Sequence, residues 1–324
     1  MNFDAVEKIA AAILYEGYIL YPYRKTAIKN RQRWNFGTLY PRVYAERQRP
    51  QEPFRLVAEC LAVADIDAAL HVKISFLQLV RQQGPTGPHE LTDPSLAWEE
   101  AVERTSEHPN LKIRDSLRAP SEIAIHLDGA ALPEERSGIA PVDLEALLRI
   151  SAERLQGGSC KLSLELMNTS PLTNGADARR DEALPQSFVS AHVVIGINGG
   201  EFVSLLDPPA AYSASVAACN NVGVFPVLAG GEPARSLMLC SPIILYDYPQ
   251  IAPESEGDFF DGTEMDEMLT LRVLTLTDSE KEEMRQGDPR ARRILERTES
   301  LTGEAMLRAH GVVRSLSDIR EDAS

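Results

Sequence analysis

The sequence predicts an α+β protein with one or more mixed or mainly antiparallel sheets, an N-terminal helix and C-terminal helices. Alternating apolar and polar runs fill the middle of the chain, helical spacing marks the N-terminus, and a capping-box pattern precedes the C-terminal helices. The 324 residues are 44% hydrophobic and 25% charged, as in ordinary globular proteins. We expect residues 1–110 to hold the N-terminal helix, a basic aromatic segment and the first strands. Residues 111–324 would hold a β-rich core and the C-terminal helices, with one continuous domain as the alternative.

The first half of the chain opens with apolar residues at helical spacing between positions 3 and 21, which predicts an amphipathic helix ending near Gly17. Alternation over residues 72–80 predicts a half-buried strand. Residues 96–108 are acidic and are expected to form a short helix stopped by Pro109. Residues 141–155 carry leucines that fit one side of a second helix.

Further strands are predicted from short β-like runs, at residues 122–127, 161–167, 188–197, 201–206, 224–228 and 237–240. The pair Asn198-Gly199 between two of these runs indicates a tight hairpin turn, because both positions accept positive φ angles. Near the C-terminus, Thr277 and Glu280 form a capping-box pattern at the start of a helix. Another helix is expected from residue 289 through 301 and beyond.

The overall charge limits the classes of partner. Lys and Arg total 33 against 48 Asp and Glu, a net charge of −15 that repels nucleic acid and anionic lipid. The apolar segment near the N-terminus is interrupted by Glu16, so we expect no membrane insertion. Widely spaced cysteines without a paired C-x-x-C predict a cytoplasmic protein without structural zinc. No P-loop, G-x-G-x-x-G or H-E-x-x-H occurs, the histidines are isolated, and no cofactor is expected.

The basic aromatic segment, residues 15–49, is the most unusual part of the sequence. Residues 24–50 hold eight cations against one acid, or +7, which leaves −22 on the remainder. A segment of this composition can bind proteins or anionic ligands. Internal ion pairs with the acidic remainder of the chain would also account for its basic residues. Single-stranded nucleic acid is disfavoured by the remaining negative charge. The candidate partner-binding residues are Tyr21, Tyr23, Arg24, Arg31, Arg33, Trp34 and Phe36.

A second unusual segment covers residues 241–267, where an apolar, strand-like sequence is followed by an acidic loop that contains prolines. Tyr246, Asp247 and Tyr248 at its start are candidate partner-binding residues. The acidic loop 254–267 is interpreted as solvated, as a docking surface, or as a weaker metal or acid–base site. In the metal interpretation the ligands would be Glu254, Asp258 and Asp261.

Three stretches, residues 14–24, 30–37 and 241–255, resemble a family of uncharacterised bacterial proteins encoded beside [NiFe]-hydrogenase structural and maturation genes. Residues 271–278 and 288–292 are also similar to that family. The resemblance implies a role in making, assembling or supporting a hydrogenase, and it implies no catalytic residue. The sequence lacks the marks of other hydrogenase helpers, since Asn2 replaces the cysteine of small chaperones and neither a P-loop nor paired C-x-x-C is present.

The leading hypothesis is therefore a non-enzymatic accessory, assembly or scaffold protein. It would dock on a hydrogenase subunit or maturation factor through the basic aromatic segment, the acidic loop, or both. One alternative is a metal-dependent enzyme of unknown reaction that uses the acidic loop 254–267. Another is a self-assembling structural protein, which would form a homo-oligomer.

Overall fold

A computed structural model describes residues 3–14, 37–81, 99–129, 142–155, 158–172, 174–250, 273, 275–285 and 289–300. The chain divides into two compact units. One unit, called the β body here, comprises residues 1–15 and 34–250. The other, called the C-terminal unit, comprises residues 16–33 and 251–324.

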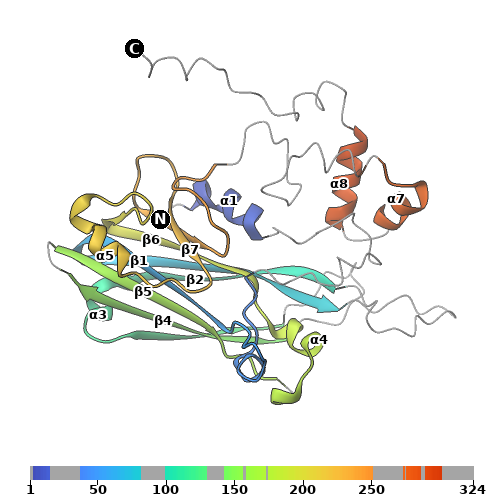
Figure 1. Cartoon of the computed structure of the whole chain (residues 1–324), viewed down its shortest axis with the longest axis horizontal. Coiled ribbons are helices and arrows are strands. Elements are labelled where there is room, and N and C mark those ends of the chain that lie inside the picture. The colour runs from blue at the N-terminus through green and yellow to red at the C-terminus, as the bar shows by residue number, and fades with distance from the viewer. Residues whose placement is uncertain are drawn as a thin grey trace, which may run out of the picture. The chain divides into compact units, whose positions relative to one another are not determined.

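The β body contains long strands joined by short helices (Figure 1). Its strands are β1 (Arg55–Arg81), β2 (Glu99–Lys112), β3 (Ser121–Leu127), β4 (Leu144–Arg154), β5 (Ser159–Asn168), β6 (Val189–Val203), β7 (Phe225–Ala229) and β8 (Leu237–Ser241). Its helices are α1 (Asp4–Leu14), α2 (Arg42–Ala45), α3 (Ile113–Ser116), η4 (Gly175–Asp177), α4 (Arg180–Ala183), η5 (Leu184–Gln186), η6 (Ala210–Tyr212) and α5 (Ser213–Ala217). The C-terminal unit shows α7 (Asp278–Arg285) and α8 (Pro289–Ser300).

The described strands form one antiparallel sheet in the order β3-β4-β5-β1-β6-β8-β7, with β2 paired to β1 off this path. β1 organises the sheet because its first half pairs with β5 and its second half with β2, while β6 follows its other edge. The sheet curls into a nearly closed barrel (Figure 1). The expectation of a mainly antiparallel sheet is confirmed, and helices are a minor part of the β body.

Two apolar clusters pack on opposite faces of this sheet. The interior is lined by alternate residues of the strands, and its largest members include Phe76 and Phe188, whose rings stack with centroids 4.3 Å apart. On the outer face, α1 covers β6, β7 and β8, as its apolar spacing predicts. The α1 cluster comprises Phe3, Val6, Ala10, Ile13, Val194, Val227, Ala229, Leu237 and Leu239.

Two predicted helices are strands in the structure. Residues 99–112 form β2, whose register with β1 runs from Arg81 opposite Glu99 to Ala69 opposite Lys112. Residues 144–154 form β4, in which Leu144, Leu148 and Ile150 are buried on alternate positions. At residues 144–154 the helix prediction was wrong because a short apolar run fits either period. At residues 99–112 the acidic segment carries no apolar periodicity of its own, and pairing with β1 decided the outcome.

The predicted hairpin at Asn198-Gly199 is also wrong, since β6 continues through it as one strand. Here β1 bulges instead, because residues 65–68 lie between the pairs Ala64–Gly200 and Ala69–Asn198. Gly199 has a φ of +81°, and a Cβ on Gly200 would lie 2.8 Å from the Val63 carbonyl oxygen. The two glycines thus permit the close approach of a bulged neighbour.

The C-terminal helices begin as predicted. The Thr277 backbone N–H donates to Glu280 Oε2 at 2.6 Å, and the Glu280 N–H donates to Thr277 Oγ1 at 3.4 Å, which completes the capping box of α7. The last predicted helix is confirmed as α8. Among the described residues, no helix combines the length and apolarity needed to cross a membrane.

Candidate functional site

Most predicted partner-binding and metal residues lie outside the described part of the chain. These are Tyr21, Tyr23, Arg24, Arg31, Arg33, Trp34 and Phe36 of the basic aromatic segment, and Glu254, Asp258 and Asp261 of the acidic loop. Their roles stay predictions. Tyr246, Asp247 and Tyr248 are described and are considered below.

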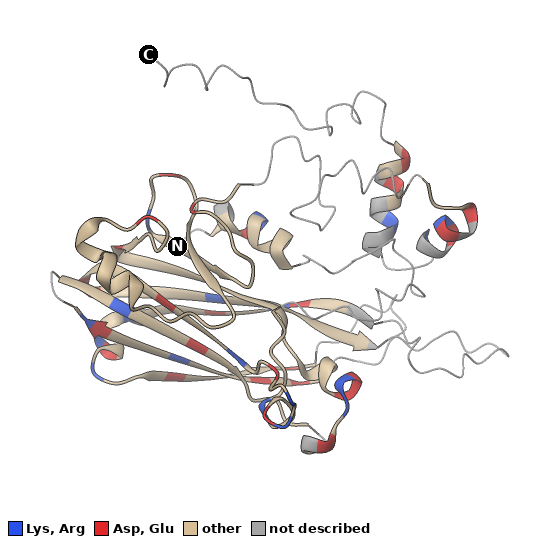
Figure 2. Cartoon of the chain, viewed as in Figure 1, with Lys and Arg blue, Asp and Glu red and all other residues tan. Residues whose placement is uncertain are grey.

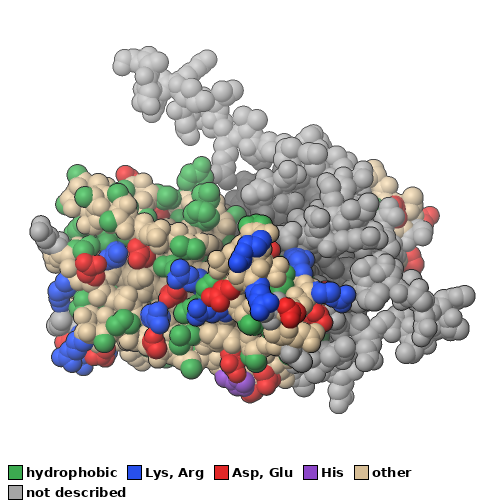
Figure 3. Space-filling model, turned by 60° about the horizontal axis from the view of Figure 1, so that its bottom comes forward, with side chains coloured by type: hydrophobic (Ala, Val, Ile, Leu, Met, Phe, Trp, Pro, Cys, Tyr) green, Lys and Arg blue, Asp and Glu red, His purple; other side chains and the backbone are tan. Residues whose placement is uncertain are grey.

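The described end of the basic aromatic segment has partners within the chain. Arg42 Nε lies 2.7 Å from Glu46 Oε1, and Arg47 Nη1 lies 3.2 Å from Asp177 Oδ1. Arg49 donates to the Glu46 carbonyl oxygen at 3.0 Å. Basic and acidic positions are interleaved along the chain and on the face shown in space-filling form (Figures 2 and 3). Arg42 and Arg47 are therefore paired with carboxylates, whereas Arg49 is bonded to a backbone carbonyl and keeps its positive charge.

The segment of residues 243–248, which follows β8, alternates between packed and exposed side chains. Ile243 and Leu245 pack against the α1 cluster. Between and after them, Ile244 is 74% exposed and Tyr246 is 86% exposed. The segment thus projects two large side chains into solvent from a backbone that is anchored on its opposite side.

Asp247 fixes the end of this segment to the sheet. Its Oδ1 accepts from the Leu228 backbone N–H at 2.7 Å, and its Oδ2 accepts from Ser204 Oγ at 2.5 Å. The next residue, Tyr248, donates its N–H to the Leu228 carbonyl oxygen at 2.7 Å. Both backbone groups of Leu228 are therefore satisfied, as if by a neighbouring strand.

Two residues before Leu228 on the edge strand β7, Pro226 has no backbone N–H to donate. Asp247 and Pro226 together protect this edge against pairing with another strand. Two other exposed apolar side chains, Leu206 at 54% and Phe225 at 45%, lie close along the chain to Ser204 and Leu228. The 243–248 segment is thus anchored to β7 and Ser204, and its large exposed side chains are Ile244 and Tyr246.

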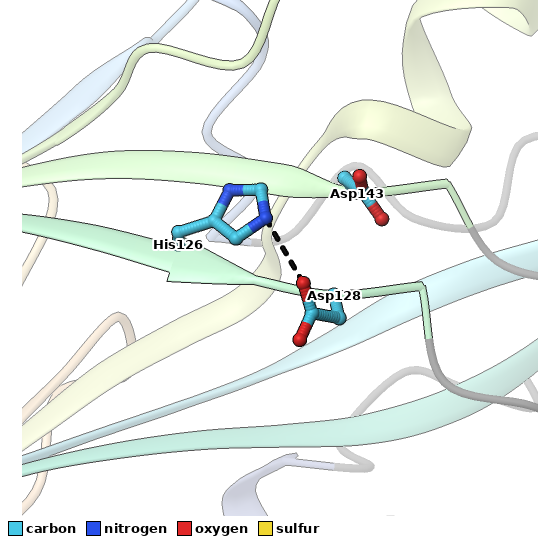
Figure 4. A group of neighbouring side chains, drawn as sticks. All are labelled: His126, Asp128 and Asp143. Atoms are coloured by element: carbon cyan, nitrogen blue, oxygen red, sulfur yellow. Dashed lines mark ion pairs between the residues drawn. The ribbon is translucent and has the colours of Figure 1, made fainter.

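A second group of side chains meets at the β3–β4 connection (Figure 4). His126 lies on β3, Asp128 follows that strand, and Asp143 precedes β4. One donor atom from each side chain lies within 4.8 Å of the other two, and His126 Nε2 is 3.0 Å from Asp128 Oδ1. The sequence interpretation missed this group because it treated the histidines as isolated, although the His-x-Asp spacing at a strand end was a local signal.

Buried side chains hold the backbone around this His-Asp-Asp group. Arg104 of β2, only 8% exposed, donates through its guanidinium to the Asp128 carbonyl oxygen. Gln78 of β1, fully buried, donates through Nε2 to the Val142 carbonyl oxygen at 2.7 Å. Strands β1 and β2 thereby fix both ends of the connection between β3 and β4.

The cysteines do not form a reactive centre. Cys60, Cys160 and Cys240 are buried members of the interior cluster, and burial raises the pKa of each thiol. Burial also raises the pKa of the half-buried Cys219. Since the thiolate is the reactive form, these positions behave as small apolar residues near neutral pH.

The comparisons with known proteins give no family. No family model matches the chain, and no curated protein matches it. Among solved structures, the chain is similar at 11% identity and a TM-score of 0.11 to the Salmonella SPI-1 type III secretion injectisome secretin InvG in its open gate state. The alignment covers 63% of this chain and 63% of the secretin chain. A TM-score this low defines no common fold.

Proposed function

We propose that this protein is a non-enzymatic accessory or assembly protein of a [NiFe]-hydrogenase. It docks on a hydrogenase subunit or maturation factor, and its 243–248 segment supplies the contact. The observation that carries the docking proposal is the pair of exposed side chains, Ile244 and Tyr246, on a backbone fixed by Asp247. The association with hydrogenase rests on the sequence resemblance, which includes this segment.

The physical argument is one of preorganisation. Interface residues that dominate binding are often aromatic, and they bind best when little conformational entropy is lost on docking. Here the backbone is already ordered by Leu228 and Ser204, and the packed side chains on either side restrict it further. A partner therefore needs to order only the exposed side chains.

An enzymatic role receives less support. A general acid or base needs a titratable group in a site that receives substrate, whereas the two carboxylate oxygens of Asp247 accept from the Leu228 N–H and the Ser204 hydroxyl. The acidic loop 254–267, on which the enzymatic alternative rests, lies outside the described residues. A cytoplasmic location and the absence of nucleic-acid partners remain parts of the proposal that come from composition and charge alone.

The test is affinity capture from the native cell under hydrogenase-expressing conditions, using the tagged full chain. The variant Ile244→Ser/Tyr246→Ser should retain about one tenth or less of the captured hydrogenase component, because two central apolar contacts are worth at least about 1.4 kcal/mol together. The melting temperature should stay within about 2 °C, since both side chains are exposed.

The matched control is Val43→Ser/Val142→Ser, which removes two apolar side chains that are 41% and 40% exposed elsewhere on the β body. This control should capture as much partner as the unaltered chain. Equal capture by the Ile244/Tyr246 variant would exclude the segment as the docking surface. If the unaltered chain captures no hydrogenase component, the proposed association with hydrogenase is contradicted instead.

A further inference from the structure

We infer that strand β3 is the contact surface for a second copy of this chain, which pairs with it as an antiparallel strand across a two-fold axis at Ala124. β3 is the last strand at its end of the sheet, and in the described part of the chain it pairs only with β4. An edge strand offers a row of backbone donors and acceptors to another strand. This self-association is independent of docking through residues 243–248.

The contacts of β4 show which backbone groups of β3 lie on the free edge. The Glu145 carbonyl oxygen accepts from the Thr169 N–H at 3.0 Å, on the side of β4 that faces β5. Successive residues of a strand direct their backbone groups to alternate edges, so Ala146 is directed to β3, where it lies opposite Ile125. The backbone groups on the free edge of β3 are therefore those of the alternate residues Glu122, Ala124 and His126.

The two ends of the sheet differ in how their edges are protected. At β7, Pro226 lacks an N–H and Asp247 accepts from the Leu228 N–H. β3 contains no proline or lysine, and its register with β4 shows no bulge. The Arg104 guanidinium contacts the Asp128 carbonyl oxygen, which lies beyond the last residue of β3. β3 thus lacks the features by which natural sheets prevent pairing at an exposed edge.

The sequence of β3 identifies its partner as another copy of itself. In antiparallel pairing about Ala124, Glu122 of each copy lies opposite His126 of the other. On the inner face of the strand, Ile123 lies opposite Ile125 of the other copy. This register pairs every backbone group on the free edge and places groups of complementary charge opposite each other.

Neighbouring registers are less favourable. An axis at Ile123 would place His126 opposite Pro120, which has no N–H. An axis at Ile125 would place Glu122 opposite Asp128, which has the same charge. A slip by one residue would direct the isoleucines to solvent. The axis at Ala124 is therefore the register that the sequence favours.

The two charged side chains are available to a second copy. The Glu122 side chain is 51% exposed and that of His126 is 55% exposed. Arg149 contacts Oε1 of Glu122, at 2.9 Å from Nε and 2.7 Å from Nη2, which leaves Oε2 for the partner. His126 Nε2 lies 3.0 Å from Asp128 Oδ1, which leaves Nδ1. Exposed ion pairs add little affinity, so we assign them the choice of register and assign the affinity to the backbone bonds.

The test is sedimentation equilibrium of the full chain. Because the contact is a strand of seven residues, we expect a monomer–dimer equilibrium with a dissociation constant on the order of 10 µM. Ala124→Pro removes the N–H that each copy donates at the axis and should raise that constant at least about tenfold. Circular dichroism should be unchanged, since this N–H is not directed to β4. Ala124→Ser retains the N–H and should dimerise as the unaltered chain does.

A second variant covers the case in which proline disturbs the strand. Ala124→Lys leaves the backbone intact and places two ammonium groups opposite each other at the axis, so it should also weaken the dimer at least about tenfold. The Ile244→Ser/Tyr246→Ser chain, which is altered on the other surface, should dimerise normally. The inference is overturned if the unaltered chain is a monomer at about 0.1 mM. It is also overturned if both Ala124 variants associate as tightly as the unaltered chain, or if the Ile244/Tyr246 variant dissociates instead.

Discussion

Replacing Phe188 by alanine is expected to destabilise the β body by about 3–5 kcal/mol. The ring is completely buried and stacks on Phe76, so truncation leaves a cavity between the second half of β1 and the start of β6. The backbone of Phe188 also exchanges two hydrogen bonds with Leu39, at 2.8 and 3.0 Å. Phe188 therefore connects the interior, where its ring packs, to residue 39, with which its backbone pairs.

Chemical denaturation monitored by circular dichroism measures this loss. Phe225→Ala is the matched control, because that ring is 45% exposed on the edge strand β7 and its removal should cost below about 1 kcal/mol. If Phe188→Ala does not fold, Phe188→Leu gives the smaller loss of about 1–2 kcal/mol in its place. A loss below about 1 kcal/mol for Phe188→Ala would contradict the interior packing described here.

The second large effect is a pH dependence that His192 imposes on folding. This imidazole is buried in β6, and its Nδ1 lies 3.1 Å from the Ser190 carbonyl oxygen, to which the neutral ring donates. Burial, aided by the Lys73 ammonium, lowers the pKa of His192 from 6.5 to about 4. Between pH 6.5 and about 4, His192 is protonated in the unfolded chain but stays neutral in the folded chain.

Stability from His192 is therefore fully present above about pH 6.5 and is lost as the pH falls toward 4. Between about pH 7.5 and 4.5 the loss should reach about 2.5 kcal/mol, at about 1.4 kcal/mol for each unit of pKa shift. The variant His192→Asn keeps a donor for Ser190 but does not titrate, so its stability should fall by about 2.5 kcal/mol less over this range.

Denaturant titrations of both proteins at the two pH values give this difference, since contributions from the other titrating groups cancel. An NMR titration of the folded protein supplies the direct check. A His192 ring that titrates near pH 6.5 without unfolding would contradict its burial in a neutral state.

The fold was predictable where a single pattern was unambiguous. Alternation over residues 72–80 identified part of β1, and the residues that form the capping box identified the start of α7. The sequence misled where two periods fit, as at residues 144–154, where apolar side chains satisfy both a helix and a strand. Only pairing with β3 and β5 resolves that choice, and pairing over such distances leaves no local mark.

The candidate sites follow the same rule. Tyr246 could be selected because the composition of the sequence changes after β8. Its exposure, however, depends on how Ile243 and Leu245 pack against α1. The capping of the β7 edge by Asp247 requires Leu228 and Ser204, which lie far from it along the chain. The His-Asp-Asp group could not be assembled while residues 141–155 were interpreted as a helix, because Asp143 then had no defined place beside His126.

The most direct test of the docking proposal is photo-crosslinking from position 246 in the native cell. Tyr246 is replaced by a benzoylphenylalanine residue, which fits the exposed position, and crosslinked products are identified by mass spectrometry after irradiation. We expect a specific product with a hydrogenase subunit or maturation factor, and none from the same replacement at Val43. Absence of any specific product at position 246 while the chain still captures a hydrogenase component would contradict the proposal that this segment is the contact surface.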